Sequence, residues 1–145
     1  MGQLRLDVDA AFRDQQNSFG VAGVLRNSDG NLILAFGRRI EKPLSVVHAE
    51  LIALKMGLDQ LRESGFSNVQ VFSDSQMAVK AVMDPSLDFG YIGSCAQEIK
   101  NMVVEQRVLS LKHMRRSTNL VAHTLTQFVF SSPTPFCWVN GDFPS

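Results

Sequence analysis

Three acidic residues have the chemical type and the placement of metal ligands. Asp9 lies in an apolar-alternating segment, Glu50 opens a helical pattern on its apolar stripe, and Asp74 ends a second strand pattern. Carboxylates at such core-facing positions are costly to bury unless something compensates their charge, and the usual compensation is a cation. Three carboxylates brought together by separate elements are typical of a divalent-metal site, and such sites act on phosphodiesters.

Each acid also has a simpler interpretation when it is taken alone. Asp9 could be a solvated residue at a strand end. Glu50 could be an acid near a helix start, where the helix macrodipole favours negative charge. Asp74 could cap the helix that begins at Ser75. The coincidence of all three acids favours the metal site over these separate explanations.

The elements that position these acids are predicted from hydrophobic periodicity and from turn residues. Strands are predicted over residues 4–12, 19–26, 32–40, 68–73 and 108–113, and helices over 46–64, 75–84, 91–106 and 119–131. Asp29–Gly30 predicts a hairpin between the second and third strands. The helix between the third and fourth strands is long enough to cross back over a sheet, so the fourth strand should pair in parallel.

This order of elements predicts an α/β fold with a five-stranded mixed sheet. Three antiparallel strands are followed by parallel strands, and helices cover both faces. The chain has 145 residues and is 45% apolar, which is enough for one hydrophobic core. One domain is expected over residues 1–132, followed by a C-terminal tail at 133–145 that shows little periodicity.

Charge and cysteine content restrict the function and the compartment. The 14 basic and 14 acidic residues give a formal net charge of zero, which argues against strong, non-specific nucleic-acid binding but leaves room for a local basic patch. Cys95 and Cys137 have no metal-type spacing, and the N-terminus has no secretion signal layout. We therefore expect free thiols, an intracellular location without a distinction between nucleus, cytoplasm and organelle, and no membrane partner.

Five local motifs, in this order of elements, resemble type 1 ribonuclease H. The acids lie in "DVDAAF", "HAELIAL" and "VFSDS", and the other two motifs are the glycine-rich "GVAGVLRNSDGN" and the stretch "KHMRRSTNLVAHTL". The resemblance covers roughly residues 4–131. It is closest to the ribonuclease-H-like domains that are abundant in plants and related to retroelement reverse transcriptases.

The resemblance implies a ribonuclease-H-like fold and two-metal hydrolysis of the RNA strand of RNA/DNA hybrids, with 5′-phosphate products. It makes Asp9, Glu50 and Asp74 catalytic ligands of two Mg²⁺ or Mn²⁺ ions. The family's fourth acid falls at position 123, where this chain has His123. A neutral imidazole can still ligate a metal, but it carries no negative charge and suits manganese better than magnesium. His113 matches the family's loop histidine, which serves near the attacking water or the leaving product.

The same resemblance suggests where nucleic acid would bind. The backbone near Ala10, Gly20 and Gly23 is predicted to approach the minor groove, since glycine allows close approach. The other predicted contacts are Arg38, Arg39, Lys112, Arg115, Arg116 and Asn119. The alternatives are that the glycines permit tight sheet packing, that the basic residues are solvated surface and that Asn119 caps the last helix.

A second functional hypothesis is a catalytically weakened ribonuclease-H fold that serves as a nucleic-acid-binding or protein-interaction module. His123 and the zero net charge motivate this hypothesis, whereas the three acids and His113 favour the enzyme. Residues 84–91 hold no lysine or arginine, where bacterial members of the family carry a basic helix. Substrate affinity should therefore be modest and salt-sensitive.

Overall fold

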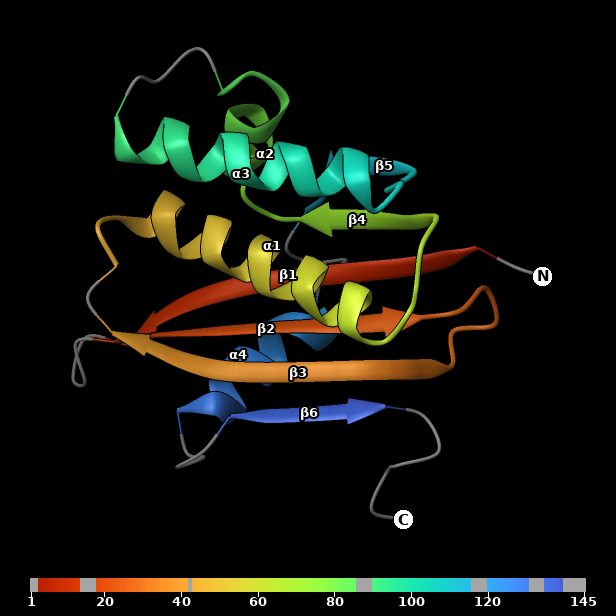
Figure 1. The fold of residues 1–145 in the computed structure, drawn as a ribbon. Coiled ribbons are helices and arrows are strands. Elements are labelled where there is room, and N and C mark those ends of the chain that lie inside the picture. Colours follow the sequence, from red (N-terminus) through yellow and green to blue (C-terminus); the bar gives the residue numbers. More distant parts are fainter. Residues whose placement is uncertain are drawn as a thin grey trace.

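A six-stranded mixed sheet forms the centre of the computed structural model, which describes residues 3–13, 18–41, 43–85, 90–115, 120–130 and 135–139 (Figure 1). The strands are β1 (Leu4–Arg13), β2 (Ser18–Arg26), β3 (Leu32–Glu41), β4 (Val69–Ser73), β5 (Ser110–His113) and β6 (Phe136–Val139). They lie in the order β5-β4-β1-β2-β3-β6. As predicted, β1, β2 and β3 are antiparallel, while β4 and β5 continue the sheet in parallel.

The sixth strand corrects the prediction of five. β6 comes from the segment expected to be a tail, and it pairs antiparallel with β3 from Leu34 to Gly37. Gly37 makes room for it, because a methyl group at this position would lie 2.5 Å from the Phe136 ring. The four residues of β6, Phe136–Val139, are all apolar and show no alternation, so the sequence pattern missed the strand.

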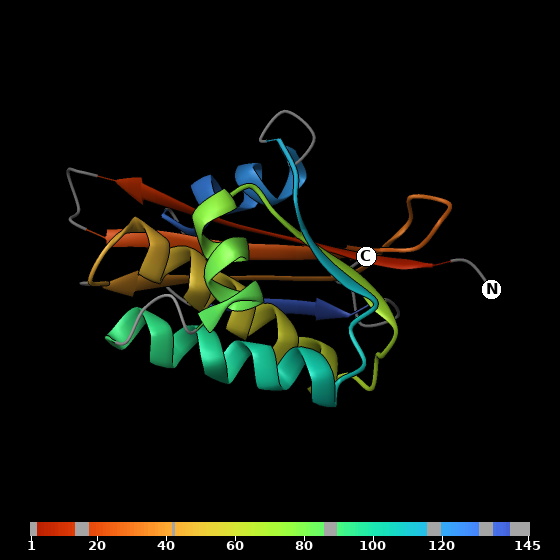
Figure 2. The same cartoon turned by 90° about the horizontal axis from the view of Figure 1, so that it is seen from above.

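The helices cover both faces of the sheet, as expected. They are α1 (Val46–Glu63), α2 (Gln76–Met83), α3 (Tyr91–Glu105) and α4 (Leu120–Val129). Figure 2 shows α4 on one side of the sheet and α1 and α3 on the other. Among the described residues, no helix combines the length and the apolar character needed to cross a membrane.

α1 is the helix that closes the main core. Its apolar stripe is buried throughout and consists of Ala49, Ala53, Leu54, Gly57, Leu58 and Leu61. Gly57 lets the helix approach β1 closely, since a methyl group there would lie 2.9 Å from a Leu6 methyl and 3.0 Å from Val8. Because side chains alternate along a strand, Leu6 and Val8 face α1 while Asp7 and Asp9 face the side of α4.

α4 packs on the opposite face of the sheet. Its buried residues are Ala122, Thr126 and Val129, whereas the apolar side chains of Val121 and Phe128 are exposed. The Thr126 hydroxyl donates a hydrogen bond to the carbonyl of His123 at 2.6 Å, so this polar side chain can be buried. Gly20 of β2 lies directly beneath the helix.

Replacing Gly20 by alanine should destabilise the protein. The added methyl group would lie 2.7 Å from the Thr126 carbonyl oxygen, a backbone atom that can move only if α4 shifts. We expect a loss of about 1–3 kcal/mol in the free energy of unfolding, as for other overpacked sites. Urea denaturation measures this loss, and an unchanged midpoint and slope would contradict the close seating of α4.

Candidate metal centre

Parallel strands and the start of a helix bring the three acids together. β1 and β4 pair with Val8 opposite Ser73, so Asp9, in the middle of β1, and Asp74, directly after the end of β4, lie side by side. α1 adds Glu50 from its N-terminal part. One carboxylate oxygen from each of the three residues lies within 4.8 Å of the others. The structure therefore contains the acidic cluster that the sequence predicts.

The simpler interpretations of the single acids do not hold. Asp9 is fully buried and Glu50 almost so; neither is solvated. Glu50 lies beyond the first turn of α1, where the macrodipole effect is concentrated. The cap of α2 is Ser75, whose hydroxyl accepts a hydrogen bond from the amide of Ala78 at 3.1 Å, so Asp74 is not needed for that role.

The chemistry of the cluster fits a divalent cation. Carboxylates this close repel one another when all are ionised, and burial strengthens that repulsion. Hard oxygen ligands are those that Mg²⁺ and Mn²⁺ take in proteins. Asp9, Glu50 and Asp74 are thus the residues that could hold such an ion.

His123 lies at the cluster but is engaged with one of the acids. Its Nδ1 is 3.0 Å from Oδ2 of Asp9. In the neutral tautomer that donates this hydrogen bond, Nε2 is the ring nitrogen that keeps a lone pair for a metal. A hydrogen bond to a ligand carboxylate fixes the orientation of that carboxylate. Position 123 therefore reaches the site through Asp9.

His113 and the basic residues predicted to bind nucleic acid lie at the surface. His113 is the exposed last residue of β5 and pairs with Ser73, one residue before Asp74. Lys112 and Arg115 are exposed beside it. On β3, Arg38 is exposed and Arg39 half-buried, two strands away from β1. Arg116 and Asn119, the remaining predicted contacts, lie outside the described residues.

The glycines of β2 have a packing role, which is the alternative that the sequence left open for them; a backbone contact to nucleic acid at these positions stays a prediction. Both are buried in a strand that is paired along both edges. A methyl group on Gly20 would meet Thr126, and one on Gly23 would lie 2.3 Å from the Phe36 ring. Ala10 is likewise buried, with its side chain in the core beneath α1.

His48 supports the turn that delivers Glu50, a role that sequence inspection did not assign to it. Its Nδ1 accepts a hydrogen bond from the amide of Leu44 at 2.9 Å, and its own amide donates to the Ser45 hydroxyl at 3.0 Å. The ring also packs edge-on against Tyr91. Burial lowers the pKa of His48, which keeps the ring neutral and its Nδ1 an acceptor. In the sequence, the helix N-cap pattern that begins at Ser45 was the signal that could have pointed to this role of His48.

Asp7 is a second buried acid of β1, and the sequence pattern did not identify it as a functional residue. It lies two residues before Asp9 and therefore on the same face of β1. Arg5 and Arg26 contact its two carboxylate oxygens. The i, i+2 spacing of the two aspartates was the signal for it in the sequence.

Replacing Glu50 by glutamine should have opposite effects without and with metal. In chelator the variant should melt higher than the parent, because one of three repelling charges is gone. With Mn²⁺ it should gain less stability than the parent, because a charged ligand is gone. We expect shifts of several degrees, since about 1 kcal/mol corresponds to roughly 2–8 °C for a small domain. Thermal melting in both buffers measures them.

Glu63→Gln is the matched control for this prediction, because Glu63 ends the same helix and is exposed. Its melting temperature should differ little from that of the parent in either buffer. Equal shifts of Glu50→Gln in chelator and in Mn²⁺ would count against a shared metal site.

Comparisons with known proteins identify the fold and the family. A family model described as reverse transcriptase-like matches residues 7–129. RNase H1 from the halophilic archaeon Halobacterium salinarum is 23% identical with a TM-score of 0.70, covering 90% of this chain and 98% of that one. LC11-RNase H1, isolated from compost, is 20% identical with a TM-score of 0.77, covering 90% and 97%. A search of curated protein sequences found no match.

A viral polymerase has the same fold in one of its parts. The foamy viral protease-reverse transcriptase is 11% identical with a TM-score of 0.68, and the match covers 88% of this chain and 20% of that one. The predicted ribonuclease-H-like fold is therefore confirmed. By its family match and by this fold, the chain belongs to the reverse transcriptase-like family of ribonuclease-H-like proteins.

Proposed function

We propose that the chain is a metal-dependent endoribonuclease that hydrolyses the RNA strand of RNA/DNA hybrids and leaves 5′-phosphate ends. The observation that carries the proposal is the convergence of Asp9, Glu50 and Asp74 within 4.8 Å. The substrate class is supported by two proteins of the same fold: LC11-RNase H1 and the foamy viral protease-reverse transcriptase were each solved with an RNA/DNA hybrid.

The three acids would hold two ions, Mg²⁺ or Mn²⁺. When bound, such ions supply an activated water and stabilise the leaving 3′-oxygen. Asp9 and Asp74 approach the site from adjacent strands, and Glu50 approaches it from α1, so the ligands are fixed by three elements that pack on one another. The hydrogen bond from Nδ1 of His123 restrains the Asp9 carboxylate. Nε2 is then the ring nitrogen of His123 that could bind a metal ion.

His113 and the exposed cations would act on the substrate rather than on the ions. His113 ends β5 beside the residue that precedes Asp74, where an exposed imidazole can exchange a proton with water or with the departing product. Lys112 and Arg115 would meet phosphates near it, and Arg38 and Arg39 would meet them at the end of β3. Selection of RNA would depend on contacts to 2′-hydroxyl groups.

A nucleic-acid-binding module without strong catalysis is the second candidate. The observation that favours it is the contact between His123 and Asp9, which places an imidazole, and not a carboxylate, where the family has its fourth acid. A site with one negative charge fewer should hold a second cation more weakly. Cleavage assays separate the two candidates.

Asp74→Asn should abolish metal-dependent cleavage while the protein stays folded, because the change removes a ligand charge but little volume. Metal ions contribute several kcal/mol to such reactions, so the rate should fall by about a hundredfold or more. A labelled RNA/DNA hybrid is incubated with Mg²⁺ and then with Mn²⁺, beside an Asp9→Asn control. Parental rates in Asp74→Asn would mean that Asp74 is not a ligand. No cleavage by the parent in either metal would favour the binding module.

His123→Asp should strengthen magnesium-dependent cleavage, because a carboxylate adds a hard oxygen ligand and a negative charge beside Asp9. We expect a gain of about tenfold, the size of effect that neighbours of metal ligands have on affinity. The preference of the parent for manganese should shrink in the variant. Titrations of the cleavage rate against each metal measure both effects.

His123→Asn is the control for this prediction, since its amide can still donate to Asp9 without adding charge. It should show no gain with magnesium. If His123→Asp also shows none, position 123 does not limit metal binding.

A further inference from the structure

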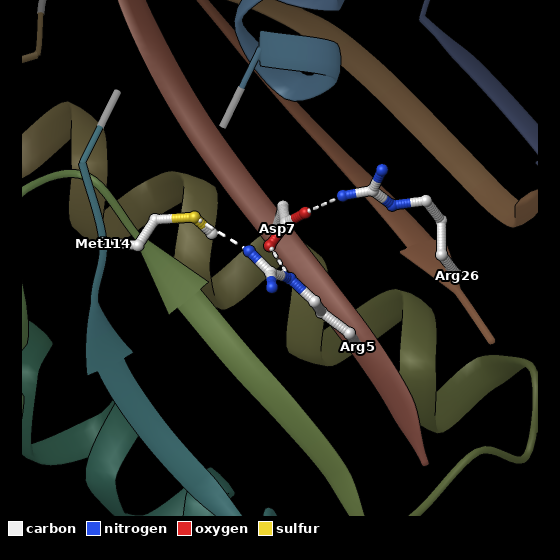
Figure 3. A network of polar contacts seen from close by, with 4 residues as sticks. All are labelled: Arg5, Asp7, Arg26 and Met114. Atoms are coloured by element: carbon white, nitrogen blue, oxygen red, sulfur yellow. Dashed lines mark hydrogen bonds and ion pairs between the residues drawn. The ribbon is translucent and has the colours of Figure 1, made fainter. Parts of the chain in front are cut away.

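Asp7 forms a buried ion-pair network on the same face of β1 as Asp9. Its side chain is 1% exposed. Arg5 Nε lies 2.9 Å from Oδ1, and Arg26 Nη2 lies 2.6 Å from Oδ2 (Figure 3). Each carboxylate oxygen of Asp7 therefore accepts a hydrogen bond from a different arginine, and these two arginines compensate the buried negative charge.

The network holds the two guanidinium groups in place at the surface of the sheet. Arg5 also donates from Nη2 to the sulfur of Met114 at 2.9 Å and stacks 4.2 Å above the Phe72 ring. The side chains of Arg5 and Arg26 remain 37% and 28% exposed. A guanidinium has five N–H donors, so both arginines keep donors for a partner from solution. A pre-oriented arginine loses less entropy when it binds an anion.

The surrounding part of the sheet is open and positively charged. α4 packs on β1, β2 and β3, whereas the described helix that contacts β4 and β5 is α2, which packs against α1 and α3. The register places Arg26, Arg5, Gln70 and Ser110 in one row across the strands, and Asp7, Phe72 and Lys112 in the next. Arg5, Arg26 and Lys112 give three positive charges against the one of Asp7, in a chain with no net charge.

This surface continues from the metal centre along the strands. Asp9 follows Asp7 by two residues and Arg5 by four. The row that contains Asp7 therefore lies about 7 Å from Asp9 along the strand, and the row that contains Arg5 lies about 13 Å from it. A nucleic-acid strand rises about 3.4 Å per charge, so a strand seated at the acids could reach both rows within about four nucleotides. Arginine matches phosphate with paired donors.

We propose that Arg5, Arg26 and Lys112 form a phosphate-binding surface for the nucleic acid that occupies the acidic cluster, and that Asp7 orients the two arginines. The proposal rests on the proposed function, since it needs a nucleic acid at that cluster. A purely structural ion-pair network would affect stability but not the salt dependence of binding.

The test is the binding of a labelled RNA/DNA hybrid in chelator, measured by fluorescence anisotropy over a series of salt concentrations. Lys112→Gln and Arg26→Gln should each lower the affinity by roughly threefold or more and reduce the slope of log affinity against log salt by about 1. Lys112 is exposed, so its variant should fold even if Arg26→Gln does not. If the folded variants keep the parent's slope of log affinity against log salt, the proposal is overturned.

Lys100→Gln and Arg62→Gln are matched controls. Both residues are exposed on helices of the opposite face, and the variants change the charge by the same amount. They should bind like the parent. If they reduce the slope as much as Lys112→Gln does, the effect belongs to overall charge and the surface is overturned.

Asp7→Asn separates orientation from charge. The variant adds one positive charge, so attraction alone would strengthen binding, whereas loss of the oriented arginines should weaken it. Asp59→Asn, which adds the same charge on α1, is the control and should not weaken binding. Stronger binding by Asp7→Asn than by Asp59→Asn overturns the role of Asp7.

The outcomes distinguish this surface from the proposed function. A parent that binds hybrid with these slopes but cuts it in neither metal overturns the nuclease alone. A parent that cuts hybrid while Lys112→Gln and Arg26→Gln keep its salt slope overturns the surface alone. A parent that neither binds hybrid in chelator nor cuts it in either metal overturns both.

Discussion

The cost of burying carboxylates is the constraint on which the arrangement around β1 depends. Asp7 and Asp9 lie on one face of this strand, and both are removed from water. Asp7 has an arginine at each oxygen, so its charge is balanced by the chain itself. Asp9 lies beside Glu50 and Asp74, and three carboxylates together call for a cation from solution. One strand thus carries two buried acids: arginines of the chain balance the charge of Asp7, and Asp9 belongs to an acidic cluster whose chemistry fits a cation.

Close approach between the helices and the sheet converts this constraint into a defined site. Gly57 brings α1 onto β1, and Gly20 brings α4 onto β2. The first contact fixes the helix that carries Glu50, and the second fixes the helix that carries His123. Neither glycine touches the acids, yet a methyl group at either would displace a helix that carries part of the site. The close packing of the two helices on the sheet therefore sets the positions of Glu50 and His123.

Periodicity explains why the sequence predicted most of the fold and the three acids. Long elements such as α1 and β1 carry enough repeats of their apolar pattern to be recognised. β6 does not, because its four residues are all apolar and show no alternation. Thr126 lies in the core of α4 because its hydroxyl donates a hydrogen bond to the carbonyl of His123, a contact that no hydropathy pattern contains. The pairing of Arg26 with Asp7 likewise depends on cross-strand register.

The two outer strands of the sheet have a further consequence for the behaviour of the protein in solution. β5 and β6 have four residues each, whereas the inner strands β1, β2 and β3 have nine or ten. An edge strand presents unpaired backbone groups that can recruit another chain, and short edges offer few of them. Lys112 also places a charge on β5, which opposes such pairing. The strand lengths thus protect a strongly paired sheet against edge-to-edge aggregation.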